Sequence, residues 1–242
     1  SLCQKKRPLS DLSRSFYQDA CHGHAIVYAD EISNRKFRPY ITYPQGNFAS
    51  PVFHGERPDP MPHYEMTGNP VSIAFSEQSP PVKMRSFKLY QDTKEIRDVK
   101  ILDKDNDPNR LLTERQFALF PLQPLEYDTD YRAVFQYRQN GKNRTAKWTF
   151  STQKPDYPYF IVKGGETLAI ESGQKYFIHW QDFWCLKQCE RYNYRMNRDT
   201  QLDIIERQVG GIIIRVNGSK GNSIRLMPEG EDRRTITLYL WK

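Results

Sequence analysis

The chain has 242 residues, of which 38% are hydrophobic and 13% aromatic, so it can bury the cores of two small domains and is not a disordered chain. A mean hydropathy of −0.79 and the lack of a long apolar run argue against a membrane span. The net charge is +7, but basic and acidic residues are interleaved, without a basic helix or a basic-aromatic run. A mildly basic, solvated surface is therefore favoured over nucleic-acid binding.

Residues 1–45 are expected to form a lead-in segment rather than a domain. Ser10 and the residues after it are typical of a helix start, and a short helix would reach Cys21. Leu12 and Phe16, four residues apart, would share one face of that helix. The segment is therefore predicted to be partly helical.

The four cysteines fall into two local pairs. Cys3 and Cys21 lie in the lead-in, and Cys185 and Cys189 lie near the other end of the chain. An even number in close pairs favours two short-loop disulfides in an oxidising compartment. Reduced buried thiols are the alternative, as is a metal site that would use Cys21 with the two nearby histidines.

Residues 44–70 contain six prolines. Because proline has no backbone N–H to donate, this composition excludes a central strand. We expect an extended segment that wraps the domain or lies at a sheet edge.

A first β-sandwich domain is predicted over residues 46–153. Tyr131, Ala133, Phe135 and Tyr137 alternate with polar residues, as in a strand that has one buried face. The pair Asn140–Gly141 favours a tight hairpin turn. The expected strands are Val71–Phe75, Ser86–Tyr90, Ile96–Leu102, Phe117–Phe120, Tyr131–Tyr137 and Lys147–Thr152.

A second β-sandwich domain is predicted over residues 154–242, after a stiff boundary that contains Pro155 and Pro158. Gly164–Gly165, Ser172–Gly173, Gly210–Gly211 and Asn217–Gly218 are turn signals between its strands. The expected strands are Tyr159–Val162, Thr167–Ile170, Lys175–Trp180, Leu202–Gln208, Gly211–Val216, Ser223–Leu226 and Thr235–Trp241. The spacing favours an immunoglobulin-like or jelly-roll arrangement.

The stretch Gln181–Thr200 lacks clear periodicity and is predicted to be a long insertion held by Cys185 and Cys189. Five aromatic residues in and beside it are candidates for a ligand-binding platform, on which a sugar ring would pack: Trp180, Phe183, Trp184, Tyr192 and Tyr194. A packed loop core explains the same residues.

An acidic run between two predicted strands is a candidate calcium site. Its oxygen-bearing side chains occupy alternate positions and are followed by a glutamate, which is an arrangement that Ca²⁺ prefers. The residues are Asp103, Asp105, Asp107, Asn109 and Glu114. Pro108 stands where an EF-hand loop needs glycine, so a solvated acidic turn is the alternative.

Several motifs resemble those of a known family. The strand at Val71–Phe75, the segment Phe117–Leu125, the strand at Tyr131–Tyr137 and the run from Trp148 to Thr152 resemble bacterial Ig-like modules of surface and secreted proteins. Tyr43–Pro44, PVFHGERPDPMP (51–62) and LDKDNDPN (102–109) resemble the region that follows the CAP (SCP-like) domain in some bacterial secreted proteins. The resemblance covers residues 3–152. The paired histidines and glutamates of the CAP domain itself are absent, so no CAP activity is implied.

The sequence predicts a non-enzymatic protein. It has no nucleophile elbow, zinc-protease motif, P-loop or dinucleotide fingerprint, and His54, His63 and His179 are isolated. We expect an extracytoplasmic bacterial module for spacing, adhesion or binding at the cell envelope, secreted, periplasmic or on the cell surface. Its partner would be a cell-surface polymer, a glycan or a protein. The alternatives are a pair of carbohydrate-binding modules and a hydrolase whose site is assembled only by folding.

Overall fold

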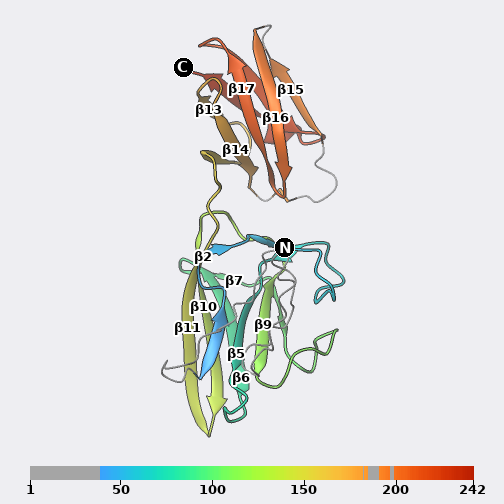
Figure 1. The fold of residues 1–242 in the computed structure, drawn as a ribbon, viewed down its shortest axis with the longest axis vertical. Coiled ribbons are helices and arrows are strands. Elements are labelled where there is room, and N and C mark those ends of the chain that lie inside the picture. The colour runs from blue at the N-terminus through green and yellow to red at the C-terminus, as the bar shows by residue number, and fades with distance from the viewer. Residues whose placement is uncertain (1–38, 182, 185–190, 197–198) are drawn as a thin grey trace, which may run out of the picture. The chain divides into compact units, whose positions relative to one another are not determined.

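The computed structural model describes residues 39–181, 183–184, 191–196 and 199–242. Within these ranges the chain is all-β, and it divides into two compact units, Ser1–Lys154 (unit 1) and Pro155–Lys242 (unit 2). Each unit is a sandwich of two sheets, which confirms the predicted fold class (Figure 1). The predicted lead-in helix, Cys3 and Cys21 lie outside the described residues.

Unit 1 packs two sheets on a shared core. Sheet I has the order β1 (Tyr40–Tyr43), β5 (Val71–Phe75), β9 (Gln116–Pro121), β8 (Val99–Leu102). Sheet II has the order β2 (Gly46–Ala49), β11 (Lys142–Thr152), β10 (Asp130–Gln139), β6 (Lys83–Gln91), β7 (Lys94–Ile96). This order places the strands as in an immunoglobulin sandwich, with the first strand divided between the two sheets.

The hairpin β10–β11 forms as its sequence pattern predicts. Tyr131 and Phe135 are 2% and 0% exposed and face the core, while Gln136 on the alternate face is exposed. Asn140 and Gly141 have φ values of 51° and 75°, the positive angles that a two-residue hairpin turn requires.

Two expectations for unit 1 were wrong. The segment Ile96–Leu102, predicted as one strand, is the end of β7 and all of β8, which belong to different sheets. Tyr40–Tyr43, assigned to the lead-in, is edge strand β1. Strands this short contain too few residues to show an alternating pattern.

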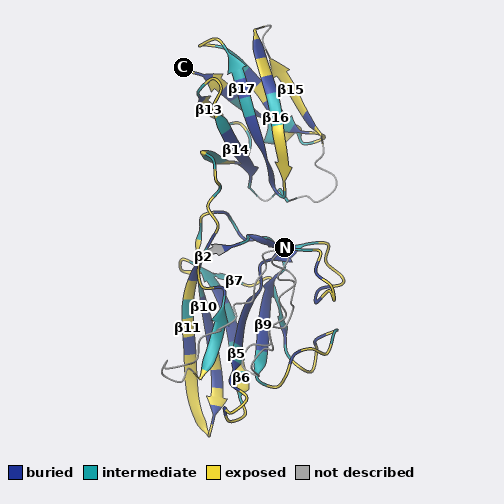
Figure 2. Cartoon of the chain, viewed as in Figure 1, coloured by how far each residue is buried: buried dark blue, intermediate teal, exposed yellow. Residues whose placement is uncertain are grey.

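The proline-rich segment wraps the outer face of sheet I, as expected. Its first residues form β2 at the edge of sheet II, and among the described residues the rest of it carries the two-stranded pair β3 (Val52–Phe53) and β4 (Thr67–Gly68). Phe53 and Met61 from this segment pack with Phe120 of β9 and Leu112 in a second hydrophobic cluster, separate from the sandwich core. Both faces of β9 are therefore buried (Figure 2).

Unit 2 also has two four-stranded sheets. Sheet III has the order β12 (Tyr159–Val162), β14 (Lys175–Trp180), β17 (Gly211–Gly218), β16 (Thr200–Gln208). Sheet IV has the order β13 (Thr167–Ile170), β19 (Ile236–Leu240), β18 (Ser223–Pro228), β15 (Tyr192–Met196), and a 3₁₀ turn η2 (Asp232–Arg234) precedes β19. The core between the sheets is mainly aliphatic and includes Ile178, Ile212 and Leu238.

Two expectations for unit 2 were also wrong. The stretch Gln181–Thr200 was predicted as an insertion, but it contains β15, which pairs with β18 as part of sheet IV. The predicted turn at Asn217–Gly218 lies inside β17; the chain turns immediately after it, where Asn222 N donates to Ser219 O at 3.1 Å.

The part of the proline-rich segment that packs on sheet I, which we call the wrap, is expected to contribute to the stability of unit 1. Met61 is 1% exposed, so Met61→Ala should lower the free energy of unfolding by about 2–5 kcal/mol through lost contacts and a cavity. Leu111→Ala is the control, because Leu111 is 46% exposed and its truncation should cost little. Denaturant titration of both variants checks this; equal small losses would show that the wrap does not form an integral core.

Candidate functional site

A groove opens in unit 2 where the edges of its two sheets meet. The edge strands there are β15 of sheet IV and β16 of sheet III, which follow one another in the chain. The groove has a volume of about 390 Å³. It is lined by Arg191, Tyr192, Asn193, Tyr194, Leu202, Ile204, Arg207 and Glu229, and we call it the seam groove.

The seam groove exists because inward-facing side chains are left uncovered at this edge. Tyr192, Tyr194 and Met196 share one face of β15, since side chains alternate along a strand. Tyr192 belongs to the core and is 8% exposed, whereas Tyr194 and Met196 are each 45% exposed. Tyr194 stands opposite Leu226, a core residue of the neighbouring strand β18. The two sheets therefore close over Tyr192 but not over the rest of β15.

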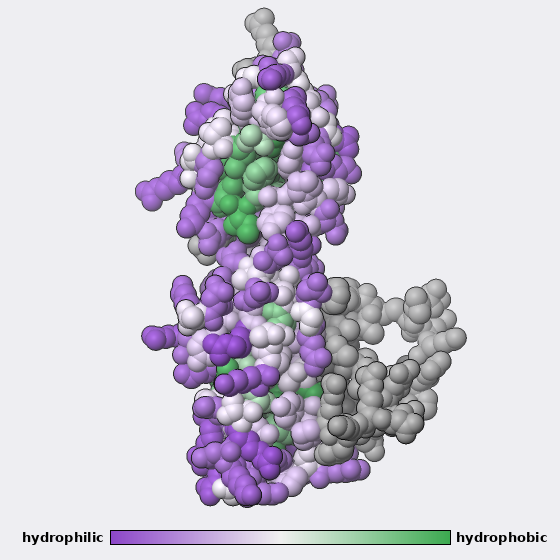
Figure 3. Space-filling view, turned by 90° about the vertical axis from the view of Figure 1, so that its left-hand side faces the viewer, coloured by the Kyte–Doolittle hydropathy of each residue, from purple (hydrophilic) through white to green (hydrophobic). Residues whose placement is uncertain are grey.

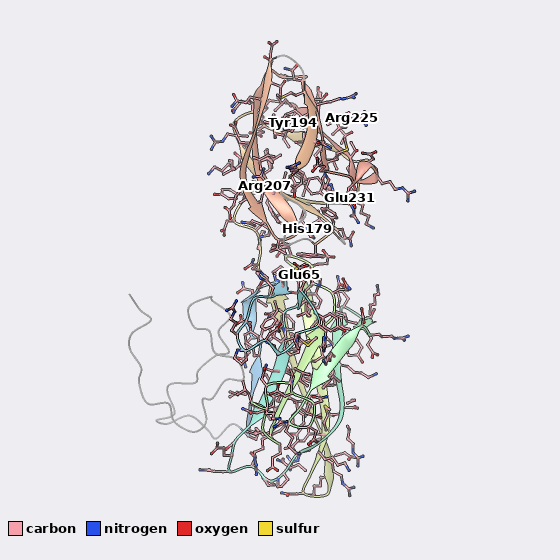
Figure 4. The ribbon with its side chains drawn as sticks, turned by 90° about the vertical axis from the view of Figure 1, so that its right-hand side faces the viewer. Glu65, His179, Tyr194, Arg207, Arg225 and Glu231 are labelled. Atoms are coloured by element: carbon pink, nitrogen blue, oxygen red, sulfur yellow. The ribbon has the colours of Figure 1, made fainter. Side chains whose placement is uncertain are left out.

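The floor of the seam groove is apolar and one end of it is charged. Leu202 and Ile204 of β16 supply apolar surface. Arg191, Arg207 and Glu229 bring charges to the end where β15 begins and β16 finishes, and Figure 4 labels Tyr194 and Arg207 on the two edge strands. The main-chain bond from Glu229 N to Arg191 O, 3.1 Å long, holds this end together.

Burial raises the pKa of the Tyr192 phenol at the charged end. Desolvation raises the pKa of Tyr192 from 10.0 to about 12, although the nearby Arg207 guanidinium acts in the opposite direction. A neutral phenol and a guanidinium thus lie close together beside the groove. With a pKa of about 12, the Tyr192 phenol is not tuned for proton transfer at neutral pH.

The structure separates the five aromatic residues predicted as a platform. Trp180 is fully buried, and its Nε1 donates to Arg234 O at 2.8 Å. Phe183 is half-buried against the core, with the Arg234 guanidinium 5.0 Å from the centre of its ring. Trp180, Phe183 and Tyr192 therefore pack in or against the core, whereas Tyr194 is exposed.

Trp184 packs back onto the sandwich. Its ring centre lies 4.7 Å from that of His179, and the His179 Nδ1 is 2.8 Å from Gly210 O. A Cβ at Gly210, which has a φ of 85°, would lie 2.7 Å from Trp184 Cε3. The indole therefore packs against a position that only glycine fits.

Sequence reasoning did not find the remaining groove residues. Leu202 and Ile204 look like ordinary core positions of a strand, and Arg207 and Glu229 look like surface charges. Only the pairing of the two sheets shows that these residues lie beside Tyr194. Cys185 and Cys189, predicted to hold this region, lie outside the described residues.

The candidate calcium residues form a turn that is held by its own main chain. The buried Asp107 carboxylate accepts three backbone N–H bonds, from Asn109 at 3.0 Å, Leu111 at 2.7 Å and Leu112 at 2.9 Å. Asp103 Oδ1 accepts from the Asp105 N–H at 3.0 Å.

The other two candidates point to different partners. The Asn109 amide donates to Asp59 O at 2.8 Å, and the exposed Glu114 pairs with its neighbour Arg115. Over the described ranges, no three His, Cys, Asp or Glu side chains are gathered as a metal ion would require. The calcium site stays a prediction, and the observed bonds explain the turn as a self-capped loop.

The calcium hypothesis has a direct test. If Asp103 and Asp105 bind Ca²⁺, the ion should raise the melting temperature by linkage, and Asp103→Ala with Asp105→Ala should abolish the rise. Asp98→Ala with Asp92→Ala is the control, since both residues are exposed and lie outside the run. An unchanged melting temperature in excess Ca²⁺ would leave the run as a turn.

Comparisons with known proteins give likenesses in fold only. No family model matches the chain, and no curated protein matches it. Among solved structures it is similar to domains 4 and 5 of the S-layer protein SbsC (13% identity, 66% of this chain and 100% of that one, TM-score 0.23). It is also similar to Yersinia pseudotuberculosis InvD (10%, 83% and 56%, 0.27) and to tandem Ig domains of titin (11%, 71% and 87%, 0.21). These TM-scores are too low to carry any functional argument.

The described part of the chain contains no helix long and apolar enough to cross a membrane.

The raised pKa of Tyr192 gives a pH prediction. Its folded pKa lies above its unfolded value, so its contribution to stability is complete below about pH 10 and is lost as the pH rises towards 12. Tyr192→Phe should make unit 2 less sensitive to alkali over that range, while Tyr239→Phe, at an exposed position, should not. Thermal unfolding between pH 8 and 11.5 checks this; an identical pH slope in all three proteins would contradict it.

Proposed function

We propose that this chain is a non-enzymatic binding module of an extracytoplasmic bacterial protein and that the seam groove binds a cell-surface glycan. One observation carries the proposal: Tyr194 faces inward on β15 and yet is 45% exposed, above an apolar floor. Exposing a large aromatic ring to water in a concave site is energetically unfavourable for a folded domain. Ligand binding, which would cover the ring, would explain why it is exposed.

The chemistry of the seam groove supports a sugar as the ligand. A sugar ring presents apolar C–H groups on its faces and hydroxyl groups at its rim. Tyr194 and the aliphatic floor match the first, while Asn193, the two arginines and Glu229 offer donors and acceptors for the second. The groove volume of about 390 Å³ lies near the lower end for small-molecule sites, which suits a short segment of a glycan.

The envelope location is supported by the sequence. Close cysteine pairs are typical of chains that fold in an oxidising compartment. The motifs of residues 3–152 resemble the region after CAP domains, so we propose that the module accompanies such a domain in a secreted or surface protein.

A cell-wall glycan array tests the proposal. The full chain should bind at least one glycan, and Tyr194→Ala should weaken that binding roughly tenfold or more, as for other central aromatic contacts. Its melting temperature should change little, because an exposed ring contributes little to the core. Tyr239→Ala is the matched control, since Tyr239 is 40% exposed on β19. The proposal fails if no glycan binds, or if both variants behave alike.

A further inference from the structure

Among the described residues of unit 1, no segment packs on the outer face of sheet II, which we call its open face. Tyr131 and Phe135 of β10 point into the sandwich, so the alternate residues Arg132, Gln136 and Arg138 lie on the opposite face. Sheet I differs, because the proline-rich wrap packs on its outer face. Within the part of unit 1 that the structure describes, the open face of sheet II is thus a sheet surface without a covering segment. Figure 3 turns the side of β11 towards the viewer and shows mainly hydrophilic residues on this unit.

Cross-strand register assembles basic side chains on this open face. Val134 at its centre stands opposite Lys88 of β6 on one side and Lys147 of β11 on the other. The next row, two positions further along each of the three strands, consists of the polar residues Ser86, Gln136 and Thr145. The next row places Arg138 opposite Lys83. These side chains come from three neighbouring strands, so none of them depends on a loop for its position.

The row on the other side of Val134 adds a fifth cation. Arg132 stands between Tyr90 of β6 and Thr149 of β11, and its guanidinium carbon lies 4.5 Å from the centre of the Tyr90 ring. Packing against the ring restrains the guanidinium and fixes its orientation. The open face therefore holds Lys83, Lys88, Arg132, Arg138 and Lys147, and we call this set the basic face.

Acidic groups neutralise only part of the basic face. Glu95 of β7 pairs with Lys88 at 3.1 Å, and Asp130 lies at the margin, bonded to Ser151. In the part of the chain that the structure describes, Lys147, Arg138 and the other two cations make no ion pair with a carboxylate. The basic face keeps a net positive charge on a rigid surface.

We propose that the basic face binds a linear anionic polysaccharide. Neighbouring strands lie about 4.8 Å apart and residues two apart along a strand about 6.8 Å, so the cations form a flat lattice along which an extended polyanion can lie. Ser86, Gln136 and Thr145 form the polar row between the cations and can hydrogen-bond to hydroxyl groups; Ser86 Oγ already donates to Gln136 Oε1 at 2.8 Å.

The basic face lacks what nucleic acids need. Single-stranded binders stack bases on exposed aromatic rings, but Tyr90 is half-buried and covered by Arg132. Reading duplex DNA requires a helix or a projecting ribbon that enters a groove, and this surface is the flat side of a five-stranded sheet. A flexible polyanion without bases fits the surface better.

Heparin, a sulfated polysaccharide, is the probe for the first test, with neutral dextran as the blank. The full chain should bind heparin at low salt, and affinity should fall steeply as salt rises. Arg138→Gln with Lys147→Gln should lower affinity roughly tenfold and reduce the salt slope by about two, one for each lost contact. Lys220→Gln with Arg225→Gln removes the same charges from exposed positions of unit 2 and should change affinity by less than about twofold.

Lysine acetylation gives a second measurement that needs no variant. Bound heparin should protect Lys83, Lys88 and Lys147 but not Lys163 or Lys220. The proposal is overturned if heparin does not bind, if both double variants lose affinity equally, or if protection falls elsewhere. It is also overturned if duplex or single-stranded DNA of equal charge competes better than heparin. The seam groove lies in unit 2, so its own test with Tyr194→Ala succeeds or fails independently.

Discussion

Burial of strand β9 on both faces determines how unit 1 is built. Leu119 faces the sandwich core, and Ala118 and Phe120 face the wrap; all three are at most 1% exposed. A strand with no solvated face needs a third layer, and the proline-rich segment supplies it. Since proline leaves fewer backbone donors to satisfy, this segment can lie across a sheet without forming a strand ladder of its own. Sheet II, on whose outer face no described segment packs, carries the basic face there.

In unit 2 the candidate surface lies at a sheet edge and not on the face of a sheet. The described residues place the edge strands β15 and β16 on the same side of the sandwich, where Tyr194 and Met196 are each 45% exposed. Exposed edges invite pairing with other chains, and β16 counters this with charges and with an irregular register between Ile204 and Glu206. The seam groove lies between two such edges. Its walls are fixed by sheet hydrogen bonds, so a ligand would find the site already formed.

Much of the fold could be predicted from the sequence where the pattern is strong. The hairpin from Tyr131 to Thr152 alternates over many residues, and Asn140–Gly141 determines its turn. Strand β15 could not be found this way, because only Tyr192 of its residues is buried and no alternation is visible. For the same reason the aromatic residues near it looked like one platform, whereas Trp180 is core and Tyr194 is surface. Of the two proposed binding surfaces, only Tyr192 and Tyr194 of the seam groove were among the predicted ligand-binding residues. The other residues could not be predicted, because each surface depends on which strands are neighbours, and local sequence does not determine cross-strand register.

In each unit the second strand runs parallel to the last one, and this pairing has a mechanical consequence. In unit 1 β2 runs parallel to β11, and in unit 2 β13 runs parallel to β19. When the two ends of such a unit are pulled apart, the force slides one strand along the other and loads their hydrogen bonds together, instead of opening them one at a time. Each unit therefore has a strand connectivity in which stretching loads these parallel pairs in shear.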